Sequence, residues 1–89
     1  MNVTYRKAFL KDLKKLKNLP IYDKVFEFAF ADLVDAKSLK DLNNVKPMRG
    51  YSKRYRLRFG DYRVGIELQN DTVDIKRVLH RRDIYRYFP

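Results

Sequence analysis

The sequence between Arg54 and Leu68 predicts a β-hairpin, and this hairpin constrains the fold more than any other segment. Two runs of alternating apolar and polar residues flank the dipeptide Gly60-Asp61, which is a recognised signal for a two-residue turn. Successive side chains of a strand point to opposite faces, so each run has an apolar face and a polar face. The two-residue loop then sets the expected cross-strand partners: Phe59 with Tyr62, Arg58 with Arg63, and Arg56 with Gly65.

The predicted register gathers arginines on one face of the hairpin around a glycine. Arg58 opposite Arg63 is a like-charge pair, which destabilises a strand pair by up to ~1 kcal/mol. Gly65 has no side chain, and a glycine within a strand often marks the close approach of a ligand or of another backbone. Two interpretations stay open from the hairpin alone, an anion site or the solvated basic face of a half-buried hairpin. The arginines concerned are Arg54, Arg56, Arg58 and Arg63.

A third strand is expected after a second turn at Asn70-Asp71, over residues 72–79. Strict alternation beyond Ile75 would place Arg77 in the core. One extra residue near Lys76, a β-bulge, avoids this, and bulges are common next to active sites. The bulge redirects the residues that follow it, with Val78 pointing inward and Arg77, Leu79 and Arg81 turned to the arginine face.

The N-terminal part predicts a short strand followed by a helical hairpin. Residues 2–5 alternate as a strand, and from Lys7 the apolar residues recur at helical spacing. The first helix ends at Asn18-Leu19-Pro20, because the residue before a proline avoids the helical conformation, and a second helix runs over residues 21–34. The residues expected in the core are Phe9, Leu10, Leu13 and Leu16, then Val25, Phe26, Ala29, Phe30 and Leu33, with Phe28 off the stripe.

The remaining segments complete a single domain over residues 1–89. A helical turn within residues 35–42 is expected to place Leu39 and Leu42 under the sheet, and a short strand is expected within residues 45–48. A loop and one helical turn are expected within residues 81–88. The predicted fold class is α+β: an N-terminal strand, a helical hairpin, then a three-stranded antiparallel meander forming one sheet. The helices cover one face of this sheet, and the other face carries the arginines.

The composition narrows the partners and the chemistry. The chain carries a net charge of +10, and nine of its ten arginines lie at or after Arg49. Arginine suits planar, bidentate phosphate contacts, so nucleic acid is the expected partner. The absence of cysteine excludes disulfides and thiolate sites, and the single histidine, His80, leaves no metal cluster, so no metal or cofactor is expected. No segment resembles a membrane span or a signal peptide, and the chain is expected to be cytoplasmic.

Two motifs in succession resemble those of the RelE/ParE toxin superfamily, namely Gly60-Asp61-Tyr62-Arg63 and His80-Arg81-Arg82-Asp83-Ile84-Tyr85. The resemblance covers essentially the whole chain and implies the RelE-like microbial RNase fold. It also implies the toxin of a type II toxin–antitoxin system, neutralised by a cognate antitoxin that wraps it. Toxins of the RelE branch are ribosome-dependent endoribonucleases that cut mRNA and so inhibit translation. Toxins of the ParE branch poison DNA gyrase instead, which is the alternative function.

The resemblance further implies which residues form the active site. Arg56, Arg58 and Arg63 match the positions that bind the scissile phosphate in the RelE branch. Arg81 and Tyr85 match the later arginine and the terminal tyrosine that complete the site. Other basic residues expected to bind mRNA or ribosomal RNA are Arg54, Arg82, Lys14 and Lys15, with Arg82 as the alternative to Arg81.

The residue types suit RNA cleavage through the 2′-hydroxyl. This reaction needs a base for the 2′-hydroxyl proton, cations for the charge that develops on the phosphate, and help for the leaving 5′-oxygen. Arginines supply the charge stabilisation, at about 10²–10³-fold for each well-placed group. Tyrosine is a weak base near neutral pH, but neighbouring guanidinium groups favour its phenolate, so Tyr85 is the candidate base. Arg81 is expected to donate a hydrogen bond to the leaving group. Two alternatives stay open: Tyr85 is a packed anchor, or His80 is the base.

Overall fold

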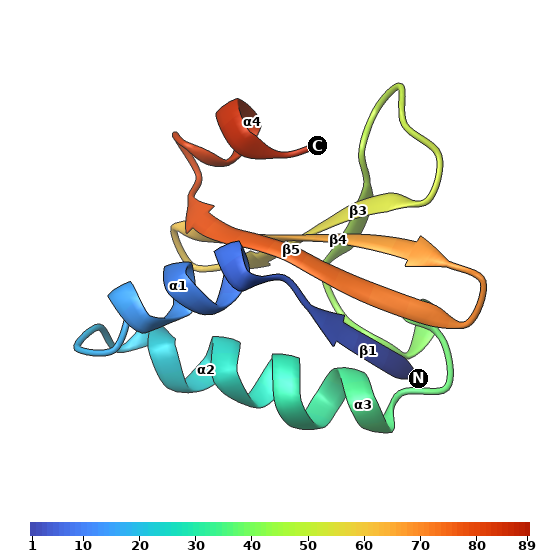
Figure 1. Cartoon of the computed structure of the whole chain (residues 1–89), viewed down its shortest axis with the longest axis horizontal. Helices are drawn as coiled ribbons and strands as arrows, with labels where there is room; N and C mark the ends of the chain where they lie inside the picture. The colour runs from blue at the N-terminus through green and yellow to red at the C-terminus, as the bar shows by residue number, and fades with distance from the viewer.

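The computed structural model describes residues 1–89 as a sheet with three helices on one face and a short helix on the other (Figure 1). In chain order the elements are β1 (Asn2–Tyr5), α1 (Lys7–Lys15), α2 (Ile21–Glu27), a π-helical turn (Phe28–Asp32), α3 (Leu33–Asp35), a 3₁₀ turn (Leu39–Asp41), β2 (Val45–Pro47), β3 (Arg54–Phe59), β4 (Tyr62–Gln69), β5 (Thr72–His80) and α4 (Ile84–Tyr87). α4 is the helix that lies alone on its face. None of the helices has the length and apolar character that crossing a membrane requires.

The five strands form one sheet in the order β1-β5-β4-β3-β2. β3, β4 and β5 are the predicted antiparallel meander, and the β3–β4 partners are those expected from a two-residue turn. β1 joins the meander in parallel with β5, and β2 pairs antiparallel with the outer edge of β3. The predicted α+β fold and meander are therefore confirmed, within a sheet that carries one further strand at each edge.

The β-bulge predicted in the third strand of the meander is present in β5. The β4–β5 ladder shifts by one residue between Gly65 and Ile66, which leaves Lys76 as the extra residue. Val78 is therefore buried in the main core, whereas Leu79 turns toward α4 on the opposite face. Without the extra residue, an arginine would enter the core in place of a valine.

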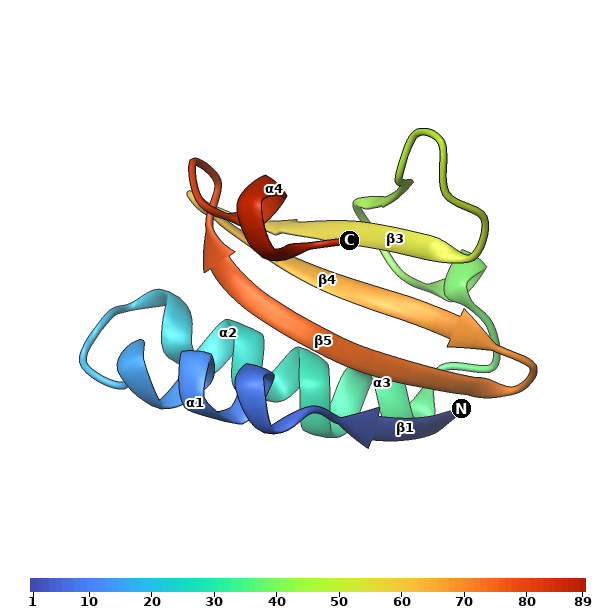
Figure 2. The same cartoon turned by 45° about the horizontal axis from the view of Figure 1, so that its top comes forward.

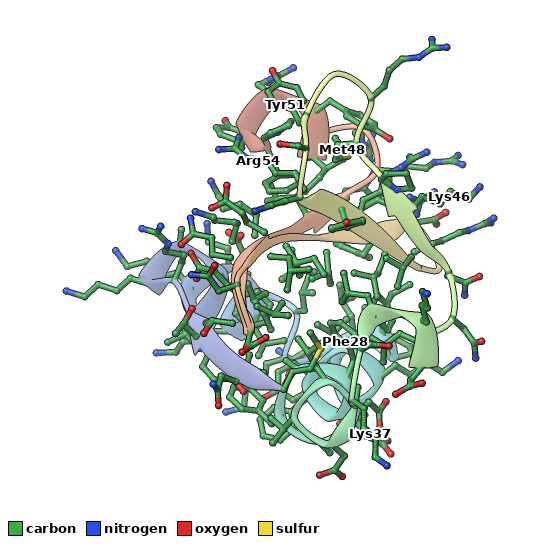
Figure 3. All side chains as sticks on the ribbon, turned by 90° about the vertical axis from the view of Figure 1, so that its right-hand side faces the viewer. Phe28, Lys37, Lys46, Met48, Tyr51 and Arg54 are labelled. Atoms are coloured by element: carbon green, nitrogen blue, oxygen red, sulfur yellow. The ribbon has the colours of Figure 1, made fainter.

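The main core lies between the sheet and the α1–α3 layer. In Figure 3, Phe28 lies on the helix side of the sheet, and Met48, Tyr51 and Arg54 lie on the other side. Each fully buried aliphatic or aromatic side chain of such a core contributes about 1.5–3 kcal/mol of transfer free energy. The largest fully buried side chains of this core are Phe9, Val25, Leu33, Leu57, Val64, Ile66, Val73, Ile75 and Val78, and Leu39 and Leu42 pack against this cluster as predicted.

The helices bury most of the predicted core residues but not all of them. The confirmed ones are Phe9, Leu13, Leu16, Val25, Ala29 and Leu33. Phe28 is in the core, where its ring centroid lies 5.1 Å from that of Phe59. Phe26 and Phe30 are 45% and 37% exposed, and Leu10 of α1 is exposed as well, so the prediction was wrong for these residues. The apolar residues of the second helical segment satisfy helical spacing on two overlapping faces, and the pattern alone does not choose between them. The π-helical turn also rotates the residues that follow it relative to those before.

A smaller apolar cluster lies on the opposite face of the sheet, beneath α4. Met48, Ile84 and Phe88 are buried there, and Leu79 packs against them. Met48 comes from the β2–β3 connection, which rises on the same side of the sheet as α4 (Figure 2). The predicted C-terminal helical turn is thus confirmed, and this cluster holds it above the arginine face.

Asp12 of α1 is the one buried charged residue, and it ties α1 to the edge of β5. Its carboxylate accepts hydrogen bonds from Nε and Nη2 of Arg77 at 2.7 and 3.0 Å, and from the backbone N–H of Val78 at 3.2 Å. β1 pairs only with residues 72–75 of β5, so Asp12 satisfies a backbone donor that β1 leaves open. The sequence prediction did not include this pair.

Candidate active site

A small polar pocket lies on the arginine face, where β2, β3 and β4 run side by side. Its volume is about 160 Å³, and its five lining residues, none of them hydrophobic, are Asn44, Lys46, Arg56, Arg58 and Arg63. The strand register assembles it, because Lys46 pairs with Arg56 and Arg58 pairs with Arg63. Four cations around so small a space suit an anion such as a phosphate group.

Asn44 and Lys46 are pocket residues that the sequence prediction missed. A short strand was expected here, but its partner strand was not. β2 pairs with the outer edge of β3, and this pairing carries Lys46 to a position opposite Arg56. The available signal was the alternation within the short strand, since Val45 packs against the core and the next side chain must then point to the arginine face.

The pocket is not centred on Gly65, although the sequence indicated a close approach there. Phe88, from the end of the chain, covers Gly65. The segment that approaches is therefore the protein's own C-terminus. The anion pocket lies farther along the same face, around Arg58 and Arg63.

No carboxylate balances the charge of the pocket. Arg56, Arg58 and Arg63 form no ion pair, and Nη1 of Arg63 donates to the carbonyl oxygens of Gly60 and Tyr62 at 2.8 and 3.0 Å. Partial burial, followed by the charges of Arg58 and Arg56, lowers the pKa of Arg63 from its ordinary value. A bound anion would offset this positive charge.

Tyr85 stands at the rim of the pocket. It belongs to α4, its side chain is 56% exposed, and Nη1 of Arg56 donates a hydrogen bond to its hydroxyl oxygen. The guanidinium carbon of Arg56 also lies 5.6 Å from the centroid of the Tyr85 ring. The residues that anchor α4 by burial are Ile84 and Phe88, so the packing role does not fall to Tyr85.

Arg81 lies beside the β3–β4 turn and acts on the pocket through its charge. The backbone N–H of Arg81 donates to the carbonyl oxygen of Asp61 at 2.7 Å, which holds Arg81 beside the β3–β4 turn. After burial and the nearer arginines, the charge of Arg81 also contributes to lowering the pKa of Arg63. Arg82 is exposed, and its backbone N–H donates to Nδ1 of His80.

His80 lies on the helix side of the sheet, away from the pocket. Its ring packs edge-on against Tyr62, with ring centroids 5.5 Å apart. It lines a cleft with Leu19 and Pro20 of the α1–α2 connection. The sheet therefore separates His80 from Tyr85 and the pocket arginines. No three histidine, cysteine, aspartate or glutamate side chains gather to hold a metal ion.

The other residues predicted to bind RNA lie apart from the pocket. Nε of Arg54 contacts Oε2 of Glu67 at 3.0 Å, and its guanidinium carbon lies 5.5 Å from the ring centroid of Tyr51. Lys14 and Lys15 are exposed in the last turn of α1, in the helix layer. The structure thus brings together Arg56, Arg58, Arg63 and Tyr85 and holds Arg81 beside the neighbouring β3–β4 turn. Arg54, Lys14 and Lys15 lie elsewhere.

Comparison with known proteins places this chain in a family. The sequence matches the family model described as the ParE toxin of the type II toxin–antitoxin system parDE, over residues 3–85. It is also 41% identical over 90 residues to Toxin RelE3 of Methanocaldococcus jannaschii, with 100% of each protein covered. The chain belongs to the RelE/ParE toxin superfamily. It is a toxin of a type II toxin–antitoxin system, as the two motifs implied.

Two solved structures share the fold of this toxin. A chain of the RelB–RelE antitoxin–toxin complex from Methanococcus jannaschii is 39% identical, with a TM-score of 0.75 over 97% of this chain and 99% of that one. A chain of the toxin–antitoxin complex RelBE2 from Mycobacterium tuberculosis is 35% identical, with a TM-score of 0.67 over 90% of this chain and 96% of that one. These similarities confirm the RelE-like fold predicted from the sequence.

Proposed function

We propose that this toxin is an endoribonuclease that cleaves mRNA on the ribosome. The observation that carries the proposal is the pocket of unpaired cations with the Tyr85 hydroxyl at its rim. Mutually repelling cations around a phosphate-sized space weaken the sheet, and binding of another protein alone does not require them. RNA supplies both the phosphate and the neighbouring 2′-hydroxyl, which DNA lacks.

The pocket supplies the charge stabilisation in the proposed reaction. The 2′-oxygen attacks phosphorus, a 2′-O–P bond forms and the P–O5′ bond breaks. The products are a 2′,3′-cyclic phosphate and a free 5′-hydroxyl. Negative charge grows on the phosphate oxygens in the transition state, where Arg56, Arg58 and Arg63 donate hydrogen bonds to them. Each well-placed donor of this kind contributes about 10²–10³-fold to the rate.

Tyr85 and Arg81 act at the two reacting oxygens, Tyr85 at the attacking 2′-oxygen and Arg81 at the leaving 5′-oxygen. Tyr85 reacts as its phenolate, takes the proton of the 2′-hydroxyl and becomes the neutral phenol; Arg56 holds its oxygen beside the phosphate pocket. General base catalysis of this kind contributes about 10²–10⁴-fold. Arg81 donates a hydrogen bond to the leaving 5′-oxygen and keeps its own proton, since guanidinium does not deprotonate in proteins. Water then supplies the proton that this oxygen takes up.

The proposed partners are a cognate antitoxin and the ribosome. The similar RelE and RelBE2 structures are complexes of toxin and antitoxin, which supports an antitoxin for this toxin. Lys14 and Lys15 are exposed on α1 and are proposed to contact ribosomal RNA phosphates without sequence preference. These contacts place the enzyme on the ribosome, and the pocket on the far side of the sheet performs the chemistry.

Inhibition of DNA gyrase is the second candidate function. It is favoured by the family model, whose description names the ParE toxin of parDE. A gyrase inhibitor binds its target without cleaving a phosphodiester, so it requires neither a base nor a phosphate pocket. The two functions therefore differ in their dependence on Arg63 and Tyr85.

Cleavage of a defined mRNA on programmed ribosomes tests the proposal. Wild-type protein should cut the mRNA and leave fragments with 5′-hydroxyl ends. Arg63→Ala should lower the rate by about 10²–10³-fold, and Tyr85→Phe by about 10²–10⁴-fold, each with the melting temperature preserved. Arg86→Ala, which removes an exposed charge next to Tyr85 on α4, is the matched control and should cleave normally. Normal cleavage by a folded Arg63→Ala protein contradicts the site. Inhibition of gyrase supercoiling without any mRNA cleavage supports the second function.

A further inference from the structure

We propose that the contact between Phe88 and Gly65 positions Tyr85 for the reaction, which makes Gly65 and Phe88 positioning residues of the active site. The inference rests on the proposed nuclease function. Neither residue lines the polar pocket, and Phe88 is buried. Their role is to set where α4 sits, and hence where the Tyr85 hydroxyl sits relative to Arg56.

The packing at Gly65 leaves no room for a side chain. A Cβ atom at this position would lie 2.6, 2.7 and 2.9 Å from Cδ2, Cγ and Cδ1 of the Phe88 ring. These distances are well inside the ordinary separation of about 3.5–4.0 Å between carbon atoms in contact. Gly65 has no positive φ, so the close approach of the ring, rather than backbone conformation, is what requires a glycine.

α4 depends on this contact because it is too short to be stable alone. It has four residues, and isolated helices below ~12 residues are marginal in water. Its backbone continues to Phe88, whose N–H donates to the carbonyl oxygen of Ile84 at 2.8 Å. Ile84 and Phe88 are buried against Met48, whereas Tyr85 is more than half exposed. Burial of its neighbours, not of its own ring, therefore fixes Tyr85.

The residue that donates a hydrogen bond to Tyr85 is also the cross-strand neighbour of Gly65. Gly65 lies directly opposite Arg56 in the β3–β4 ladder, and Arg56 donates the hydrogen bond to the Tyr85 hydroxyl. A methyl group at Gly65 would have to push the Phe88 ring outward by about 1 Å to restore normal contact. Such a displacement of α4 moves Tyr85 away from Arg56 and leaves the phosphate pocket in place. A misplacement of about 1 Å in an active site can cost about 10²-fold in rate.

A double-mutant cycle with Tyr85→Phe tests the positioning role. Gly65→Ala should slow single-turnover cleavage at saturating programmed ribosomes by about 10–100-fold. In the Tyr85→Phe background the same substitution should have little further effect, because the group that it misplaces is already absent. Phe88→Ala, which leaves the sheet untouched, should show the same pattern, and it keeps the test available if Gly65→Ala does not fold. Toxin–ribosome affinity should change less than the chemical step in both variants.

Amide hydrogen exchange provides a readout that does not depend on cleavage. The Phe88 amide, which donates to Ile84, should exchange faster in Gly65→Ala than in wild type, while amides of β4 and β5 keep their protection. Unchanged exchange at Phe88 contradicts the docking role of Gly65. The positioning role is overturned if Gly65→Ala slows cleavage equally in the wild-type and Tyr85→Phe backgrounds, or in neither. The proposed nuclease function still holds in that case, provided that the wild-type protein cleaves mRNA. Absence of cleavage by the wild-type protein overturns the proposed function itself.

Discussion

The two ends of the arginine face differ in how their charge is balanced. At the paired end, carboxylates contact the basic side chains at N···O distances of 2.7–3.3 Å: Glu67 with Arg54 and Lys76, Asp74 with Arg6 and Lys76, and Asp12 with Arg77. At the unpaired end, which comprises Arg56, Arg58, Arg63 and Arg81, no carboxylate forms an ion pair. One strand, β3, supplies arginines to both ends.

The comparison shows that arginines of one strand can serve different purposes. A paired arginine links two elements, as Arg54 links β3 to β4 through Glu67. An arginine without a carboxylate partner gains no such link and repels its neighbours, but those of its N–H groups that are not bonded within the protein are available for a ligand. Residue type and strand position do not distinguish the two cases. The acidic partner distinguishes them, and it lies on another element.

The largest expected effect is the loss of mRNA cleavage when an arginine of the unpaired end is removed. Removal of an arginine of the paired end provides the comparison. Arg58→Ala should lower mRNA cleavage by about 10²–10³-fold without loss of stability, because it removes a donor to the phosphate. Arg54→Ala should lower the free energy of unfolding by about 1 kcal/mol and change cleavage far less, because it breaks a partly exposed pair with Glu67. Cleavage assays and denaturant titrations of both variants measure this. Equal losses of mRNA cleavage in Arg58→Ala and Arg54→Ala would show that the two ends of the arginine face do not differ in function.

A large loss of stability is expected when Asp12 loses its charge. Asp12→Asn should lower the free energy of unfolding by about 2–3 kcal/mol, because it leaves Arg77 without its bidentate partner in a largely buried place. Urea titration followed by circular dichroism measures the change. Asp23→Asn, at an exposed position on α2, is the matched control and should be nearly neutral. A small effect at Asp12 would show that the paired end does not hold α1 to the sheet.

A smaller effect is expected from phosphate ions at the unpaired end. Inorganic phosphate at ten times its Kd should stabilise the wild-type protein by about 1.4 kcal/mol, since binding to the folded state alone shifts the unfolding equilibrium. Arg58→Gln should abolish this stabilisation, and in phosphate-free buffer it should raise stability by a few tenths of a kcal/mol through relief of the Arg58–Arg63 repulsion. Thermal unfolding with and without phosphate tests both expectations. Undiminished phosphate protection in Arg58→Gln would place the anion elsewhere.

The smallest effect concerns acid sensitivity at the paired end. The hydrogen bond from Arg54 lowers the pKa of Glu67 from its ordinary value of 4.5. Since the folded-state pKa lies below the unfolded one, the carboxylate contributes its full stability above about pH 4.5 and loses it as the pH falls through the folded-state pKa. Glu67→Gln should therefore flatten the fall in stability below that pH. An identical acid profile in Glu67→Gln would show that this pair does not contribute to acid sensitivity.

Much of the sheet and part of the site could be predicted because their signals are local. Alternation with period two sets which face each side chain occupies, and the turn at Gly60-Asp61 sets the register, so the Arg58–Arg63 pairing followed directly. The same alternation required a bulge near Lys76, and the structure contains it. Tyr85 and the arginines of the hairpin were identified through motifs of the family. The contact between Arg56 and Tyr85 depends on the fold, because the two residues are 29 positions apart in the sequence.

Other features depend on contacts between distant segments, which no local pattern encodes. Helical spacing allowed two faces of the second helical segment, and packing against Phe59 selected the one that carries Phe28. The pairing of β2 with β3 brought Lys46 into the pocket, and the fold joined Asp12 to Arg77 across 65 residues. Only tertiary structure could show that the segment approaching Gly65 is Phe88, because burial and charge pairing are decided by what lies opposite in space.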